Sequence, residues 1–232
     1  MRESARGAGF AGSTWAILLA AGAGARLGLD RPKAFAALAG RPLLAESLER
    51  LDRCPWLDSV VVVAPPGWEE PAILLSEELA ASKVVACVTG GATRAESARA
   101  GLAEVPEEAL VVLVHDAARP LVSDAVVERV LTPLSEGFDG AVPALEVADT
   151  LKRVEGREVV ETVAREGLVR AQTPQAFLRP VLRKAFTGEL RGATDCASLV
   201  ERSGGRVAVV EGDPRLVKIT TAADLELVES WL

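Results

Sequence analysis

Two cations follow a turn of glycine and alanine near the start of the chain. The apolar run WAILLA leads into AGAGARLGLDRPK, which carries Arg26 and, seven positions later, Lys33. A turn of small residues lets the backbone approach a ligand closely and leaves its N–H groups free to bind polar atoms. Arginine and lysine beside such a turn are suited to phosphate oxygens. The stretch therefore indicates a site for a phosphorylated ligand.

This turn matches neither of the common phosphate-binding loops. The P-loop pattern GxxxxGK[ST] is absent. Gly22 and Gly24 begin a GxGxxG pattern, but Leu27 occupies the third glycine position. For the glycines alone, a tight strand-to-helix turn with solvated charges is the alternative. Arg26 and Lys33 together favour the ligand site.

Two further polar stretches also follow apolar runs. VTGGATRAES places Gly91 after one run and Ser97 about one helical turn into the next segment. VLVHDAARP places Asp116 and Arg119 after another. In open α/β sheets, ligands bind beyond the carboxyl ends of the strands. We expect Asp116 to hold ligand hydroxyl groups or a magnesium ion.

His115 is the only histidine in the chain, and it precedes Asp116. A His–Asp pair suggests a hydrolase triad, but the chain has no GxSxG motif, and neighbours on a strand point to opposite faces. We therefore expect a structural histidine. Lys218 lies in a short strand-like segment and carries no functional prediction on its own. Thr221 is predicted to cap a final helix from Ala222.

Apolar runs alternate with helical patterns along the chain. Such runs are typical of strands buried on both faces of a parallel sheet, and they cover 15–20, 59–64, 83–88, 109–117, 140–144 and 206–212. Helix-like segments cover 42–54, 71–82, 94–105 and 123–137, the last with Ser123 as N-cap. The alternation predicts a doubly wound, mostly parallel α/β sheet.

Residues 149–177 break this alternation. LKRV and EVVETVA flank the turn-like EGR, which predicts a projecting β-hairpin arm at about 146–172. An isolated two-stranded ribbon is marginally stable in water, so we expect a partner surface to cover the arm. A symmetric dimer built around two such arms would provide one.

Composition narrows the class of protein. The chain has 232 residues, 49% of them hydrophobic, and a net charge of −7, which argues against a general nucleic-acid binder. No apolar run approaches the ~20 residues of a membrane span. Three cysteines without a CxxC pair indicate a reducing compartment. We expect a disordered tail at 1–14, without a secretory signal, one domain at 15–232, and a cytoplasmic protein.

Seven stretches together resemble one enzyme family. They are AAGAGARLGLDRPKAF (20–35), GGATRAES (90–97), HDAARP (115–120), DTLKR (149–153), QTPQAF (172–177), TDCAS (194–198) and VEGDPRLVKIT (210–220). The first alone is similar to many sugar nucleotidyltransferases. HDAARP combined with DTLKR and QTPQAF resembles the 2-C-methyl-D-erythritol 4-phosphate cytidylyltransferases of non-mevalonate isoprenoid synthesis.

This resemblance implies a Rossmann-like nucleotidyltransferase that acts as an arm-exchanging homodimer. It would transfer CMP from CTP to methylerythritol phosphate and release pyrophosphate, with Mg²⁺ held largely by the CTP phosphates. By motif, the residues that hold CTP would be Ala20, Ala21, Gly22, Gly91 and Ser97. Arg26 and Lys33 would stabilise the transition state. The polyol-phosphate site would use Asp116, Arg119, Thr150 and Thr173, and the attacking phosphate would be positioned by Arg165 and Lys218.

The chain departs from the family pattern at three places. Ala92 stands where an acidic residue is common, Cys196 replaces a usual glutamate, and Leu216-Val217 precede Lys218 where Asn-Ile is frequent. None of these changes removes a predicted catalytic cation. Two alternatives stay open: a ribitol 5-phosphate cytidylyltransferase, and a regulatory module that binds CTP without transferring it.

Overall fold

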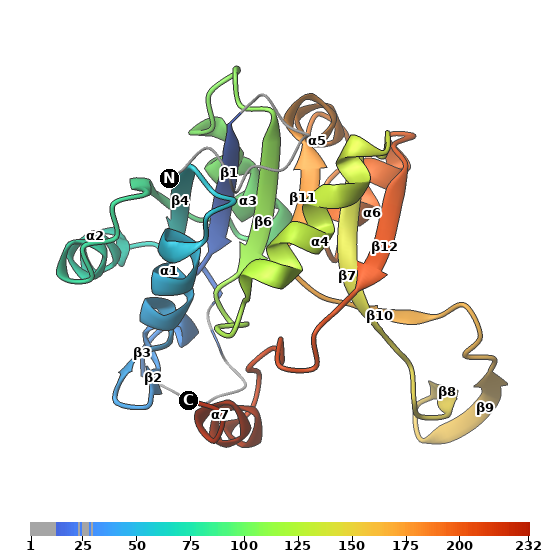
Figure 1. Cartoon of the computed structure of the whole chain (residues 1–232). Coiled ribbons are helices and arrows are strands. Elements are labelled where there is room, and N and C mark those ends of the chain that lie inside the picture. The colour runs from blue at the N-terminus through green and yellow to red at the C-terminus, as the bar shows by residue number, and fades with distance from the viewer. Residues whose placement is uncertain (1–12, 23, 25–27, 29) are drawn as a thin grey trace.

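A computed structural model describes residues 13–22, 24, 28 and 30–232. Its centre is an eight-stranded sheet in which seven strands follow the order β10-β7-β11-β6-β1-β4-β5 (Figure 1). The eighth strand, β12, pairs with the edge of β7 opposite to the one that pairs with β11. The strands are β1 (Thr14–Leu19), β4 (Ser59–Ala64), β5 (Val84–Thr89), β6 (Val111–Asp116), β7 (Gly140–Glu146), β10 (Val169–Ala171), β11 (Gln175–Leu178) and β12 (Val207–Glu211).

The sheet is parallel except for two strands that the apolar runs did not predict. β1, β4, β5 and β6 run parallel, as do β7 and β12. β11 lies antiparallel between β6 and β7, and β10 pairs antiparallel with β7. The missing side chain of Gly140 makes room for β11, because a Cβ at this position would lie only 2.4 Å from a ring carbon of Phe177. The predicted doubly wound, mostly parallel α/β fold is confirmed.

Helices cover both faces of the sheet. One apolar cluster joins alternate strand residues such as Leu18 and Val62 to α1 (Leu43–Arg53), α2 (Glu69–Glu78) and α4 (Asp124–Ser135). The other joins Ile17 and Val61 to α3 (Arg94–Ala103), α5 (Arg179–Ala185) and α6 (Cys196–Arg202). Neighbouring strand residues point to opposite faces, so the central strands β1, β4 and β6 are buried on both faces.

The two edge strands correct one prediction. The runs at 83–88 and 206–212 do form strands, β5 and β12, but they are not buried on both faces. Val85 is 54% exposed and Val209 is 58% exposed. Each strand has a neighbour on one side only among the described strands, so less of its surface is covered than in β1 or β6.

The final helix packs against the short strands that precede α1. α7 (Ala222–Glu229) begins with a capping box in which the Thr221 hydroxyl accepts from the Asp224 N–H, confirming the predicted cap. Ser123 is the N-cap residue of α4, but its side chain makes no capping hydrogen bond. A third apolar cluster packs α7 residue Val228 against Leu38, next to the short strands β2 (Ala37–Leu38) and β3 (Arg41–Pro42).

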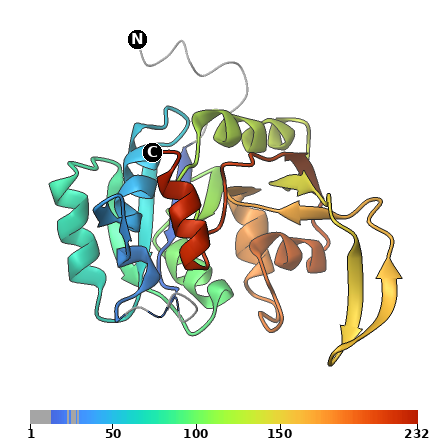
Figure 2. The same cartoon turned by 90° about the horizontal axis from the view of Figure 1, so that it is seen from below.

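The predicted hairpin projects away from the body (Figures 1 and 2). β8 (Leu151–Glu155) and β9 (Glu158–Val163) pair antiparallel in a sheet of their own. Val154 and Val159 on this arm are 58% and 56% exposed. Within the part of the chain that is described, no helix is both long and apolar enough to cross a bilayer.

Candidate active site

A cavity of about 410 Å³ opens where the carboxyl ends of β1, β5 and β6 meet. β1 and β6 end side by side, with Leu19 opposite Asp116 in the register. The cavity collects residues from five separate stretches of sequence. Eight of the predicted site residues line it: Ala20, Ala21, Gly22, Lys33, Gly91, Ser97, Asp116 and Lys218.

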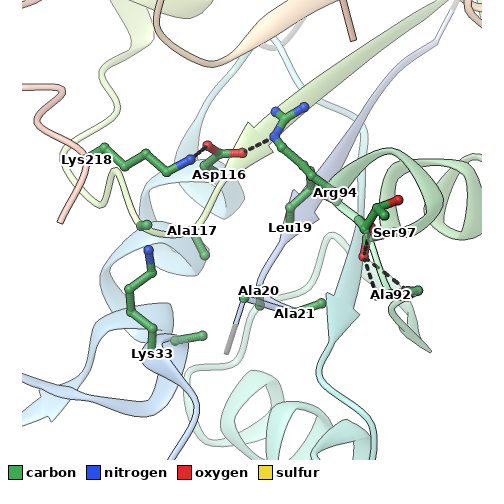
Figure 3. Close-up of a pocket in the computed structure, with 15 residues that line it drawn as sticks. Leu19, Ala20, Ala21, Lys33, Ala92, Arg94, Ser97, Asp116, Ala117 and Lys218 are labelled. Atoms are coloured by element: carbon green, nitrogen blue, oxygen red, sulfur yellow. Dashed lines mark hydrogen bonds and ion pairs between the residues drawn. The ribbon is translucent and has the colours of Figure 1, made fainter. Parts of the chain in front are cut away.

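Asp116 is held between two cations at one end of this cavity (Figure 3). Arg94 Nε donates to Asp116 Oδ1 at 2.9 Å, and Lys218 Nζ donates to Oδ2 at 2.6 Å. Burial by itself disfavours the charged carboxylate. The two cations outweigh burial and hold the pKa of Asp116 well below its usual range. Asp116 is therefore an anion at neutral pH.

Lys33 reaches the cavity from the short 3-10 helix Lys33–Phe35. Its ammonium group donates to the backbone carbonyl of Ile219 at 3.1 Å. Ile219 lies next to Lys218 in sequence, and its own N–H donates to the Ala118 carbonyl at 2.8 Å. The C-terminal segment is thereby held over the end of β6, and its Lys218 lines the same cavity as Lys33.

The loop between β5 and α3 is closed by its own side chains. Ser97 Oγ accepts from the Gly91 N–H at 3.1 Å and lies 2.9 Å from the Thr93 carbonyl, to which it donates. Thr93 and Glu96 form a capping box at the start of α3. A Cβ on Gly90 would lie 2.3 Å from the Cβ of Ala21. The two glycine-containing loops therefore pack directly against each other.

His115 is fully buried beneath the site, as expected of a structural histidine. Its Nε2 lies 3.0 Å from the Arg119 carbonyl, and its Nδ1 lies 3.0 Å from Thr173 Oγ1. A carbonyl only accepts, so Nε2 carries the proton and Nδ1 accepts from the threonine hydroxyl. Thr173 Oγ1 in turn accepts from the Asp116 N–H at 3.1 Å. Burial lowers the pKa of His115 to about 4.

Comparison with known proteins shows the family of this chain. Residues 14–232 match the IspD family model, 2-C-methyl-D-erythritol 4-phosphate cytidylyltransferase. The chain belongs to this family. The protein of that name from Nocardia farcinica is 44% identical over 222 residues, covering 95% of this chain and 94% of the relative. The one from Saccharopolyspora erythraea is 45% identical over 225 residues, covering 95% and 99%.

A solved structure of the same family has a similar fold. The crystal structure of 2-C-methyl-D-erythritol 4-phosphate cytidylyltransferase from Thermus thermophilus has a TM-score of 0.77 at 37% identity and covers 93% of this chain and 97% of that chain. The predicted class, a nucleotidyltransferase that transfers a cytidylyl group, is confirmed. The reading as a cytidylyltransferase of methylerythritol phosphate is favoured over the ribitol 5-phosphate and regulatory alternatives.

Some site residues predicted from the cytidylyltransferase motifs lie elsewhere. Arg26 lies outside the described residues. Thr150 and Arg165 lie on the exposed arm, where Arg165 Nη1 donates to the Ala148 carbonyl, and neither lines the cavity. Arg119 lies beside the site and donates to the Leu216 carbonyl at 2.5 Å.

Sequence reasoning missed Arg94 in this cytidylyltransferase. It is the first residue of α3, and its guanidinium turns towards the end of β6 rather than to solvent. The only available signal was its place in GGATRAES, between the glycine pair and Ser97. A single arginine at a helix start gives no indication of its partner, because that partner stands 22 residues later.

Proposed function

We propose that this protein joins CTP to 2-C-methyl-D-erythritol 4-phosphate by transferring CMP and releasing pyrophosphate. One observation carries the proposal: Lys33, Arg94 and Lys218 converge on one cavity beside the small-residue loop Ala20–Gly22. A cavity lined by three cations and one carboxylate suits an anionic ligand, and the loop offers bare backbone to a nucleotide.

The reaction brings two anions together. A phosphate oxygen of the acceptor attacks the α-phosphorus of CTP, and the bond from that phosphorus to the oxygen bridging it to the β-phosphate breaks. Negative charge grows on the oxygens around the α-phosphorus and on the leaving pyrophosphate. The protein therefore needs positioned cations more than covalent chemistry. We assign the stabilisation of this negative charge to Lys33. Arg26 is given the same role because of its place in the motif AGAGARLGLDRPK.

The same proposal places the acceptor near Asp116 and Lys218. The Lys218 ammonium would position the attacking phosphate, while Asp116 would accept from polyol hydroxyls. The Thr173 hydroxyl proton is committed to His115, so Thr173 acts here by fixing the Asp116 backbone. Ala20, Ala21, Gly22, Gly91 and Ser97 would form the nucleotide wall, with Ser97 shaping the loop that carries Gly91.

Mg²⁺ is part of the proposal. The described residues hold no cluster of three His, Cys, Asp or Glu side chains suited to a metal ion. Asp116, the one acidic residue among the described residues that line the cavity, already pairs with two cations through its two oxygens. Magnesium commonly binds one or two carboxylates plus substrate phosphates. The CTP phosphates would therefore supply most of the ligands of the ion, and the ion would offset their negative charge.

We also propose a homodimer in which the arms are exchanged. Thr150 and Arg165 flank β8 and β9 in sequence. These two strands form an arm that leaves the body (Figure 2), and the exposed valines of the arm need a covering surface. In a two-fold dimer each arm would reach the other subunit and carry Arg165 towards its cavity. A cytoplasmic location stays a prediction.

The deciding experiment is a substrate panel. Pyrophosphate release is measured with CTP and Mg²⁺, and with methylerythritol phosphate, ribitol 5-phosphate or no acceptor. We expect release with methylerythritol phosphate to be far faster than with ribitol 5-phosphate, and none without an acceptor. Faster turnover of ribitol 5-phosphate would refute the assignment. CTP binding without any release would instead indicate the regulatory module.

A further inference from the structure

Arg94 lies between the Asp116 carboxylate and a buried thiol. Its Nη1 lies 3.6 Å from Cys196 Sγ, and its Nη2 is buried without a hydrogen-bond partner among the described residues. Burial raises the pKa of Cys196 to about 11, so this thiol is neutral at pH 7. Of the carboxylates in the described part of the chain, Asp116 alone forms an ion pair with Arg94.

Asp116 divides its two oxygens between cations of different exposure. The side chain of Asp116 is 9% exposed and that of Arg94 is 21% exposed, whereas that of Lys218 is 38% exposed. One carboxylate cannot neutralise two cations. The excess positive charge is therefore available at the more exposed member of the pair, Lys218, which lines the cavity.

We propose that Arg94 is a positioning residue, which holds the Asp116 carboxylate and thereby leaves Lys218 able to bind the acceptor phosphate. This inference rests on the proposed function. Without Arg94, Asp116 would pair with Lys218 alone. The acceptor phosphate would then compete with a full carboxylate charge for one ammonium group.

The first test separates the two substrates. The KM values for methylerythritol phosphate and CTP and the kcat are measured for wild type, Arg94→Ala and Arg94→Lys. Because a hydrogen bond to a charged group is worth about 1.5–3 kcal/mol, we expect Arg94→Ala to raise the KM for methylerythritol phosphate about tenfold or more. The KM for CTP should change less than about threefold, and Arg94→Lys should be intermediate. Arg99→Ala, on an exposed residue of the same helix, is the matched control.

A double-substitution cycle tests whether Arg94 acts through Asp116. In the Asp116→Asn background, adding Arg94→Ala should cost less than about threefold, because the carboxylate that Arg94 holds is already gone. Additive losses, or equal losses for both substrates, would overturn the positioning role and indicate a general effect on α3. Arg94→Lys keeps the cycle informative if Arg94→Ala does not fold.

Affinity for inorganic phosphate distinguishes this inference from the proposed function. Calorimetric titration needs no turnover, so it gives a result even if wild type rejects methylerythritol phosphate. We expect Arg94→Ala to bind phosphate about tenfold more weakly than wild type. Equal affinities, or no phosphate binding by wild type, would overturn the inference. A wild type that binds phosphate but releases no pyrophosphate would refute only the proposed function.

Discussion

Lys33 and Ile219 stand 186 residues apart in sequence, yet the ammonium group of the first donates to the carbonyl of the second at 3.1 Å. This hydrogen bond joins the segment after β1 to the C-terminal segment that carries Lys218. It also holds the Lys33 charge at the cavity. A carbonyl is a weaker partner than a triphosphate, so this contact positions the lysine for a nucleotide.

Replacing Lys33 should slow the chemical step. If Lys33 meets charge that develops only during transfer, Lys33→Ala should lower kcat about 100-fold or more, as loss of a preorganised stabilising group does. The dissociation constant for CTP should change much less. Steady-state kinetics and calorimetry check both values. Lys184→Ala, on the far helix α5, is the control, and near-normal kcat in a folded Lys33→Ala protein would contradict the role.

Adding one methyl group at Gly90 should weaken CTP binding. The new Cβ would lie 2.3 Å from Ala21 Cβ and push the nucleotide loop out of place. Overpacking costs about 1–3 kcal/mol, so we expect CTP to bind roughly tenfold more weakly to Gly90→Ala. Gly188→Ala is the matched control, because its Cβ would make an ordinary contact at 3.5 Å. Equal calorimetric affinities of the two variants would contradict this packing argument.

Arg165 should act on the partner subunit. Lys33→Ala and Arg165→Ala variants, each inactive alone, are refolded together. In a mixed dimer, the body with the Arg165 substitution keeps its own Lys33 and receives an intact Arg165 from its partner, so one of the two sites is whole. Random pairing makes about half the dimers mixed, and activity should recover to roughly a quarter of wild type.

Mass spectrometry of the refolded sample confirms that mixed dimers have formed. If Arg165 served its own subunit, every site in the mixture would carry one defect. Mixed dimers without recovered activity would therefore rule out the shared site.

His115 should make stability depend on pH in mildly acid solution. Its folded-state pKa is about 4, against 6.5 for an ordinary histidine, so the unfolded chain binds more protons between these values. The associated stability is present above pH 6.5 and is lost as the pH falls towards 4. The full loss is about 3 kcal/mol, because one pKa unit corresponds to about 1.4 kcal/mol.

Urea denaturation from pH 4.5 to 7.5, at one protein concentration, measures this slope. His115→Gln should be less stable at pH 7 but should show a flatter dependence over the same range. Because the chain has one histidine, proton NMR also follows its imidazole directly. An imidazole that titrates near pH 6.5 in the folded protein would contradict the buried, neutral state.

Much of the fold is determined by patterns within short stretches. The run SVVVVA predicts β4 at the residues where it occurs, and the hairpin at 151–163 follows from two β-like runs around EGR. The motifs also identify eight residues that line the cavity. Periodicity and turn chemistry act between near neighbours, so a single sequence reveals them.

Only the tertiary structure decides which distant groups meet. The four residues of β11 carry no clear strand signal, and their place between β6 and β7 depends on the space left by Gly140. The ion pair of Arg94 with Asp116 forms because the carboxyl ends of β5 and β6 lie at the same edge of the parallel sheet. The hydrogen bond of Lys33 to Ile219 forms because the C-terminal segment is held at that edge through Ala118. A residue's type states what it can bind, but packing of the whole chain selects its partner.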